Sequence, residues 1–242
     1  MCEITIIINE QTAQTIANDG FSLCAWKVVK TTAGGAQPLV WYTTTGIALN
    51  TTLGWLPQYT AYVSLGGSTF TAQSQAPINI GQIAQVEQSG QLNVVGGGPA
   101  GAMSILNQTT TQYTCGLASQ LPNVPLSPIV AMPLFGNMFN AITPVEQVLL
   151  SFTTQPLQAG QVVSVSYGQG FLIDMTESNQ RSVNFDINLG WTNGGLSWGT
   201  VIPADTPLGP LLVLAPPPSL AEEVAKRSWG DRGGGRVREQ ET

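Results

Sequence analysis

Few residues in this chain suit acid–base, nucleophilic or metal chemistry, because histidine is absent from the sequence. This absence excludes Ser-His-Asp triads, Cys-His pairs and metal centres that use imidazole. Before residue 219 the only lysines are Lys27 and Lys30, and both lie on a predicted strand beside Trp26. We expect both lysines to project from a solvated strand face. The chain is therefore predicted to be non-enzymatic.

The most closely spaced carboxylates before residue 219 lie within residues 174–186, around a predicted hairpin turn over residues 177–181. In such an antiparallel hairpin Asp174 faces Asn184, and side chains of like parity share one face. We predict that five polar side chains of that face bind a ligand: Asp174, Thr176, Ser182, Asn184 and Asp186.

Hydroxyls, amides and carboxylates beside an aromatic ring are typical of sugar-binding surfaces. The alternatives for the same residues are a Ca²⁺ site, a paired-carboxylate glycosidase and an ordinary solvated strand face. We predict a neutral ligand, such as a glycan or another protein, without a metal or a cofactor. Trp55 and Trp198 complete the predicted ligand-binding set, because the turn-like sequence around each would expose its ring for stacking. A core position is the alternative for both rings.

The segment from Gly96 to Gly101 follows a β-like run and contains the spacing GxGxxG. It resembles the glycine-rich turn of flavin- and nicotinamide-binding Rossmann enzymes, and that resemblance implies a dinucleotide-binding enzyme. Three features oppose it. Residues 107–111 are poor in helix formers, no carboxylate follows about 20 residues later, and no alternating helices surround the motif. We therefore favour a loop between two strands.

Alternation of apolar and polar residues predicts an all-β, antiparallel β-sandwich, either jelly-roll-like or made of two sandwich-like halves. It is clearest over residues 182–191, where every apolar side chain has an odd number. Further strands are predicted in the same half, over 148–154, 162–167 and 171–176. A Ser219 capping box predicts a short helix to Trp229, followed by a flexible tail. The expected division is 1–120, an N-terminal β half; 121–215, a C-terminal β half; and 216–242, a Pro-rich linker, helix and tail.

Charged residues make up 9% of the sequence, against about a quarter in typical soluble domains. Residues 1–218 hold three basic and nine acidic side chains, too few cations to neutralise phosphates, so we expect no nucleic acid partner. A surface with so little charge resists self-association weakly, which predicts a homo-oligomer or filament. A merely polar surface is the alternative.

The three cysteines form no CxxC motif, although one bridge between Cys24 and Cys115 is compatible with their spacing. We expect no signal peptide and no membrane-spanning helix, and the compartment is not predicted: the chain is either cytoplasmic or released by a non-classical route. The leading hypothesis is a non-enzymatic, self-associating β protein that acts through its surface. A membrane-active, pore-forming protein is the alternative, because residues 73–114 alternate as an amphipathic hairpin would.

Overall fold

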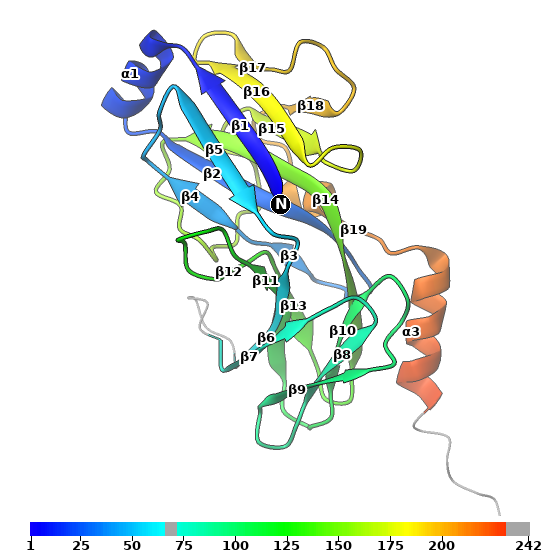
Figure 1. Ribbon diagram of the computed structural model, residues 1–242. Coiled ribbons are helices and arrows are strands. Elements are labelled where there is room, and N and C mark those ends of the chain that lie inside the picture. Colours follow the sequence, from blue (N-terminus) through cyan, green and yellow to red (C-terminus); the bar gives the residue numbers. More distant parts are fainter. Residues whose placement is uncertain (66–71, 231–242) are drawn as a thin grey trace, which may run out of the picture.

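The computed structural model describes residues 1–65 and 72–230 and consists mainly of β-strands (Figure 1). Strands account for 49% of the chain and helices for 11%, so the prediction of an all-β, sandwich-like fold is confirmed. The sheets are mixed, because β1 (Cys2–Ile8) runs parallel to β16 (Gln180–Asp186) and β8 (Gln82–Val86) runs parallel to β10 (Met103–Asn107). The antiparallel prediction therefore holds for most strand pairs but not for all of them.

The described strands form three sheets. A four-stranded sheet has the order β17-β16-β1-β5 and contains β1 (Cys2–Ile8), β5 (Asn50–Trp55), β16 (Gln180–Asp186) and β17 (Gly190–Thr192). A six-stranded sheet contains β3 (Gln37–Pro38), β6 (Tyr59–Ser64), β7 (Ser74–Ile78), β11 (Tyr113–Ser119), β12 (Ser127–Pro128) and β13 (Val130–Leu134). A nine-stranded sheet contains β2 (Ser22–Thr31), β4 (Tyr42–Thr44), β8 (Gln82–Val86), β9 (Leu92–Gly96), β10 (Met103–Asn107), β14 (Phe139–Thr153), β15 (Gly170–Asp174), β18 (Gly199–Ile202) and β19 (Val213–Leu214).

The long strand β14 connects the two ends of the molecule (Figure 1). It pairs with β10 near its start and with β15 near its end, and β2 runs antiparallel along its other edge. The core lies between this nine-stranded sheet and the two smaller sheets. β1 contributes Ile4 and Ile6 to that core, β6 contributes Ala61 and Val63, and β14 contributes Leu150. The arrangement resembles two sandwiches that share one long layer.

Both faces of β2 are covered, which explains its almost uninterrupted burial. Its residues Leu23 and Ala25 face the main core, whereas Cys24 and Trp26 face a second cluster. That second cluster is closed by the short helix α2 (Leu208–Leu212), through Leu208 and Leu212 among others. A strand buried on both faces shows no alternation of polar and apolar residues, so sequence patterns alone do not reveal which side chains it buries.

Helix α1 (Glu10–Asn18) was not expected from the sequence. Asn9 caps it, because its side-chain Oδ1 accepts the backbone N–H of Thr12 at 2.7 Å. Helix α3 (Pro218–Gly230) confirms the predicted C-terminal helix, and its Leu220 and Val224 pack on the lower part of the nine-stranded sheet. In the described part of the chain, no helix has the length and apolar character needed to span a membrane.

Three local predictions were wrong. Residues 162–167 form only isolated bridges, at Val162 and Val165, rather than a strand. The strand predicted over 182–191 ends at Asp186, where a turn begins, so Leu189 is 87% exposed instead of buried. The predicted hairpin is not formed either, because β15 pairs with β14 and β18, whereas β16 pairs with β1 and β17.

All three cysteines are free and buried, so the bridge between Cys24 and Cys115 is not formed.

The division of the chain at residue 120 stays a prediction. Each sheet combines strands from both sides of that position, as β1 with β16 and β2 with β14 show. The predicted flexible tail beyond residue 230 lies outside the described residues.

Candidate functional site

The predicted ligand-binding residues lie in three separate places. Asp174 ends β15 in the nine-stranded sheet, and its carboxylate is occupied by the Gln147 side chain (3.1 Å) and the Thr176 backbone N–H (2.8 Å). Burial alone would raise the pKa of Asp174, but these hydrogen bonds and the nearby Arg181 leave it lowered. Thr176 is exposed in the turn that follows. This first group is bonded within the protein rather than open to a ligand.

Ser182, Asn184 and Asp186 lie on the outer face of the four-stranded sheet, as their parity predicts. Asp186 anchors the next turn, since its Oδ1 accepts the backbone N–H groups of Asn188 and Leu189. These two bonds lower the pKa of Asp186, and the Asn9 amide donates a further bond at 2.8 Å to Oδ2. Because β15 does not pair with β16, this second group does not form the polar face expected with Asp174.

The two tryptophans of the predicted ligand-binding set differ in how far their rings are buried. Trp55 is 1% exposed, so the expected exposure of its ring is wrong. The face of β5 that carries Trp55 packs against the core. The neighbouring Gly54 and Pro57 do not indicate this burial. Trp198 is half-buried, with the Arg181 guanidinium 4.9 Å from its ring centroid and Phe171 against its edge. The Arg181 Nε also donates to the Asp174 carbonyl, so Trp198 belongs to a packed corner rather than a free stacking platform.

The glycine segment is a loop between β9 and β10, and no helix follows it. Gly98 packs tightly against the backbone of Gln82, where a Cβ would lie 2.9 Å from the carbonyl oxygen. The strand-turn-helix geometry that would place a pyrophosphate at a helix N-terminus is therefore not present at this motif.

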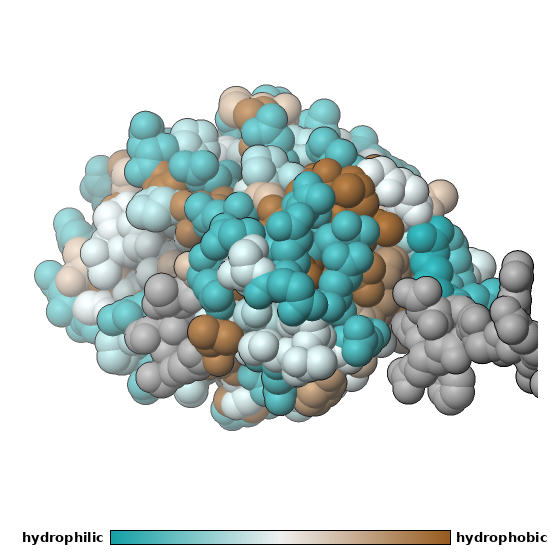
Figure 2. Space-filling view, turned by 90° about the horizontal axis from the view of Figure 1, so that it is seen from below, coloured by the Kyte–Doolittle hydropathy of each residue, from teal (hydrophilic) through white to brown (hydrophobic). Residues whose placement is uncertain are grey.

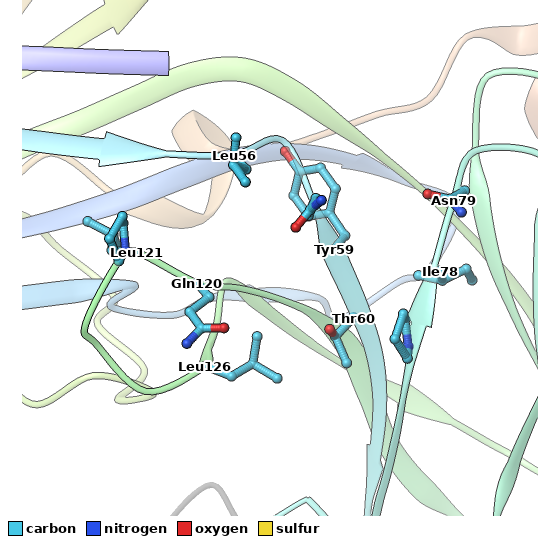
Figure 3. A pocket seen from close by; sticks show the side chains of 11 residues that line it. Leu56, Tyr59, Thr60, Ile78, Asn79, Gln120, Leu121 and Leu126 are labelled. Atoms are coloured by element: carbon cyan, nitrogen blue, oxygen red, sulfur yellow. The ribbon is translucent and has the colours of Figure 1, made fainter. Parts of the chain in front are cut away.

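A pocket that the sequence did not reveal lies between β6, β7 and the segment 120–126, with a volume of about 510 Å³ (Figure 3). Eleven uncharged residues line it: Leu56, Gln58, Tyr59, Thr60, Pro77, Ile78, Asn79, Gln120, Leu121, Pro122 and Leu126. We call it the neutral pocket. In Figure 3, Gln120, Leu121 and Leu126 lie on one side and Thr60, Ile78 and Asn79 on the other, and the Tyr59 ring at the start of β6 stands between these two groups.

The polar groups of the neutral pocket are partly free to bind a ligand. The side-chain amides of Gln58 and Asn79 are exposed and make no hydrogen bond to other described residues. Gln120 instead donates to the Val124 carbonyl at 3.0 Å, which holds the 120–126 segment in place. The neutral pocket therefore combines free amide donors and acceptors with apolar side chains, and no charged residue lines it.

Behind the pocket wall lies a buried cation. Lys27 is only 4% exposed, so the expectation that it lies on a solvated strand face is wrong. Its Nζ lies 4.4 Å from the ring centroid of Trp41, 4.7 Å from that of Trp55 and 5.5 Å from that of Tyr59. We call these four residues the lysine cage. Within the described residues, no carboxylate oxygen lies within ion-pair distance of Lys27.

The cage perturbs its ionisable members. Burial lowers the pKa of Lys27 from 10.5 to about 8, against an opposing attraction from Glu146. Burial raises the pKa of Tyr59, whose phenol therefore stays neutral. The sequence held one signal for this arrangement, because Lys27 lies in the middle of the apolar run over residues 23–29 of β2. Local patterning does not indicate which aromatic rings reach the lysine.

Comparison with protein-family models, with curated proteins and with solved structures finds no match to this chain. The neutral pocket and the exposed sheet faces are therefore the features of the molecule that indicate a function.

Proposed function

We propose that this protein is a non-enzymatic binding protein that holds a neutral carbohydrate in the neutral pocket. The observation that carries the proposal is the lining of that pocket, which combines free amides with apolar side chains and contains no charged residue. Carbohydrates present hydroxyls in the sugar plane and apolar C–H groups on the ring faces, so such a lining suits them. A charged ligand would find no counter-charge among the lining residues and would lose solvation on entry.

The pocket also favours one kind of neutral sugar. Its apolar residues Leu56, Leu121 and Leu126 can accommodate a methyl group, while the amides of Gln58 and Asn79 can both donate and accept. An acetamido substituent offers a methyl, an N–H and a carbonyl together. We therefore expect N-acetylated saccharides to bind more tightly than the corresponding plain sugars.

Isothermal titration with N,N′-diacetylchitobiose and with cellobiose tests the proposal, because the two disaccharides differ only in their acetamido groups. Asn79→Ala should weaken binding about five- to tenfold, since it removes one ligand hydrogen bond. Asn50→Ala is the matched control, because Asn50 is an exposed asparagine on β5 outside the pocket. Absence of heat with both disaccharides, followed by absence of binding across a panel of neutral glycans, would refute carbohydrate binding.

A second proposed property is self-association through the outer face of the four-stranded sheet. Ile7 is 37% exposed and Leu189 is 87% exposed, and both line a groove of about 490 Å³. Around them the sheet presents hydroxyls and amides, with the Thr5 and Thr52 hydroxyls 3.5 Å apart. Apolar residues within a mainly polar surface are typical of protein contact sites, and the one carboxylate that lines this groove, Asp186, is hydrogen-bonded to Asn9 and Asn188 of its own chain.

Figure 2 shows that the lower end of the molecule is not broadly apolar. Hydrophilic residues cover much of that end, with hydrophobic patches between them. At this end the hydrophobic residues therefore form separate patches rather than one continuous apolar surface.

Sedimentation velocity tests the association surface. The protein should form a dimer or larger species whose population falls in Ile7→Lys and Leu189→Lys, because each change buries an unpaired charge at the contact. Leu65→Lys is the control, since Leu65 is also exposed but follows β6 in the six-stranded sheet. A wild-type protein that remains monomeric at high concentration contradicts the proposal.

A further inference from the structure

The lysine cage lies where the three sheets meet. Lys27 comes from β2 of the nine-stranded sheet, Trp55 from β5 of the four-stranded sheet and Tyr59 from β6 of the six-stranded sheet. Trp41 precedes β4, and its ring meets that of Trp55 edge-on at 5.5 Å. One ammonium group therefore contacts elements of all three sheets.

Tyr59 has two roles in this arrangement. Its side chain lines the neutral pocket, and its ring centroid lies 5.5 Å from the Lys27 Nζ. A cation within about 6 Å of an aromatic centroid attracts the ring through its quadrupole. The attraction exists only while Lys27 is protonated, because a neutral amine carries no charge to present to the ring.

We propose that Lys27 is a positioning residue of the neutral pocket, whose protonation holds the Tyr59 ring in place as the pocket wall and whose deprotonation releases it. The effect on a saccharide rests on the proposed function, whereas the coupling of Lys27 to Tyr59 does not. Lys27 is not a catalytic residue in this proposal, because its amine lies behind the wall and reacts with nothing.

The ionisable groups that face Lys27 do not obscure its titration near pH 8. Cys2 of β1, Glu146 of β14 and Tyr59 of β6 are its ionisable neighbours. Burial raises the pKa of the Cys2 thiol and that of the Tyr59 phenol, so both stay protonated as the solution passes pH 8. Lys27, with its pKa of about 8, is therefore the cage member that changes charge near that pH.

The direction in which ligand affinity changes with pH follows from the protonated and the neutral state of Lys27. Below pH 8 the ammonium attracts the rings of Trp41, Trp55 and Tyr59, and the pocket wall is fixed. Above pH 8 the amine is neutral and Tyr59 keeps only its packing contacts. Ligand affinity should then fall as the pH rises through this range, since a looser wall must be ordered on binding.

Nuclear magnetic resonance of ¹³C-labelled tyrosine rings tests the coupling without a ligand. Tyr59 signals, assigned with Tyr59→Phe, should shift between about pH 6.5 and pH 9.5 with a midpoint near that of Lys27, followed through its ¹³Cε signal in the same protein. Lys27→Met should make the Tyr59 signals independent of pH over this range. Lys30→Met is the matched control, because Lys30 lies on the same strand outside the cage, and it should preserve the titration.

Each outcome decides the proposal. Tyr59 signals that do not titrate in the wild-type protein overturn it, as do signals that titrate with a midpoint unrelated to that of Lys27. The comparison of the two midpoints uses only the unmodified protein, so it holds even if Lys27→Met fails to fold. Failure of the disaccharide titrations would refute carbohydrate binding and leave this result unaffected.

Discussion

At the scale of single residues, the buried Lys27 is the most unusual feature of the chain. Its ammonium has lost water without gaining a carboxylate within ion-pair distance among the described residues, and three aromatic rings replace that solvation in part. Burial still dominates, because it lowers the pKa to about 8. Deprotonation of Lys27, which would release Tyr59, therefore also removes the unfavourable desolvation of a buried ammonium group.

This cost predicts how stability depends on pH. Between pH 8 and 10.5 the unfolded chain keeps the Lys27 proton and the folded protein releases it, so the folded state gains stability as pH rises. Relative to Lys27→Met, the wild-type free energy of unfolding should rise by on the order of 2 kcal/mol from pH 8 to pH 10. Urea unfolding of both proteins measures this difference, in which the titration of Cys24 and Cys115 cancels because Lys27 does not act on either thiol. A constant difference would show that Lys27 is charged throughout.

Phe185 provides a second prediction at this scale. It is 8% exposed, and its ring lies 4.5 Å from that of Phe152 and 4.8 Å from that of Trp191. Phe185→Ala should lower the free energy of unfolding by about 3 kcal/mol, because it leaves a cavity among packed rings. The neighbouring Asn184→Ala, on the exposed face, should change it by less than about 0.5 kcal/mol. Chemical denaturation checks both, and equal effects would contradict the observed orientation of β16.

At the scale of elements, β11 shows how closely the strands of the six-stranded sheet approach each other. Gly116 lies beside the Val130 carbonyl of the segment that pairs with it, and the Tyr62 hydroxyl donates to that same carbonyl at 2.7 Å. No side chain fits at position 116, because an added Cβ would overlap the carbonyl oxygen. The local sequence does not reveal this approach, since the neighbour comes from elsewhere in the chain.

Gly116→Ala should therefore destabilise the protein by several kcal/mol, about 3 or more, or prevent folding. The matched control is Gly54→Ala on β5, where the nearest atom to an added Cβ is the Cys2 carbonyl oxygen at 3.8 Å. Thermal unfolding should show a large fall in Tm for the first variant and little change for the second. A stable Gly116→Ala protein would mean that β11 and β13 lie further apart than described.

At the scale of the whole molecule, the sheets combine distant parts of the chain. The first strand, β1, is parallel to β16, with Ile6 opposite Val183, and β2 pairs with most of the length of β14. Each of these pairings joins residues that are more than 100 positions apart in the sequence. Neither the four-stranded nor the nine-stranded sheet can form completely until both ends of the chain contribute their strands. The chain is therefore expected to fold as one cooperative unit.

Separate fragments test this expectation. Residues 1–120 and 121–242 should each lack a cooperative unfolding transition, because each fragment loses partners from all three sheets. Mixed together, they should recover part of the native circular dichroism signal. A fragment that unfolds cooperatively by itself would instead support the division of the chain into two independent β halves.

Sequence patterns predicted several parts of the fold correctly. Alternation identified the buried face of β16, where Val183 and Phe185 point inward. The residues after Pro218 predicted α3, although the helix begins at Pro218 and Ser219 is therefore not its N-cap. The helix-poor residues 107–111 predicted a loop at the glycine motif. These features depend on neighbours in the chain, which is why the sequence by itself determined them.

Tertiary structure alone decided the partners of each element. It placed Asp174 and Asn184 in different sheets, covered both faces of β2 so that Lys27 became buried, and left Leu189 exposed on a turn. It also assembled the neutral pocket from three separate segments. Strand pairing and burial arise from contacts between residues far apart in the chain, and a local pattern of polar and apolar residues is compatible with many such pairings.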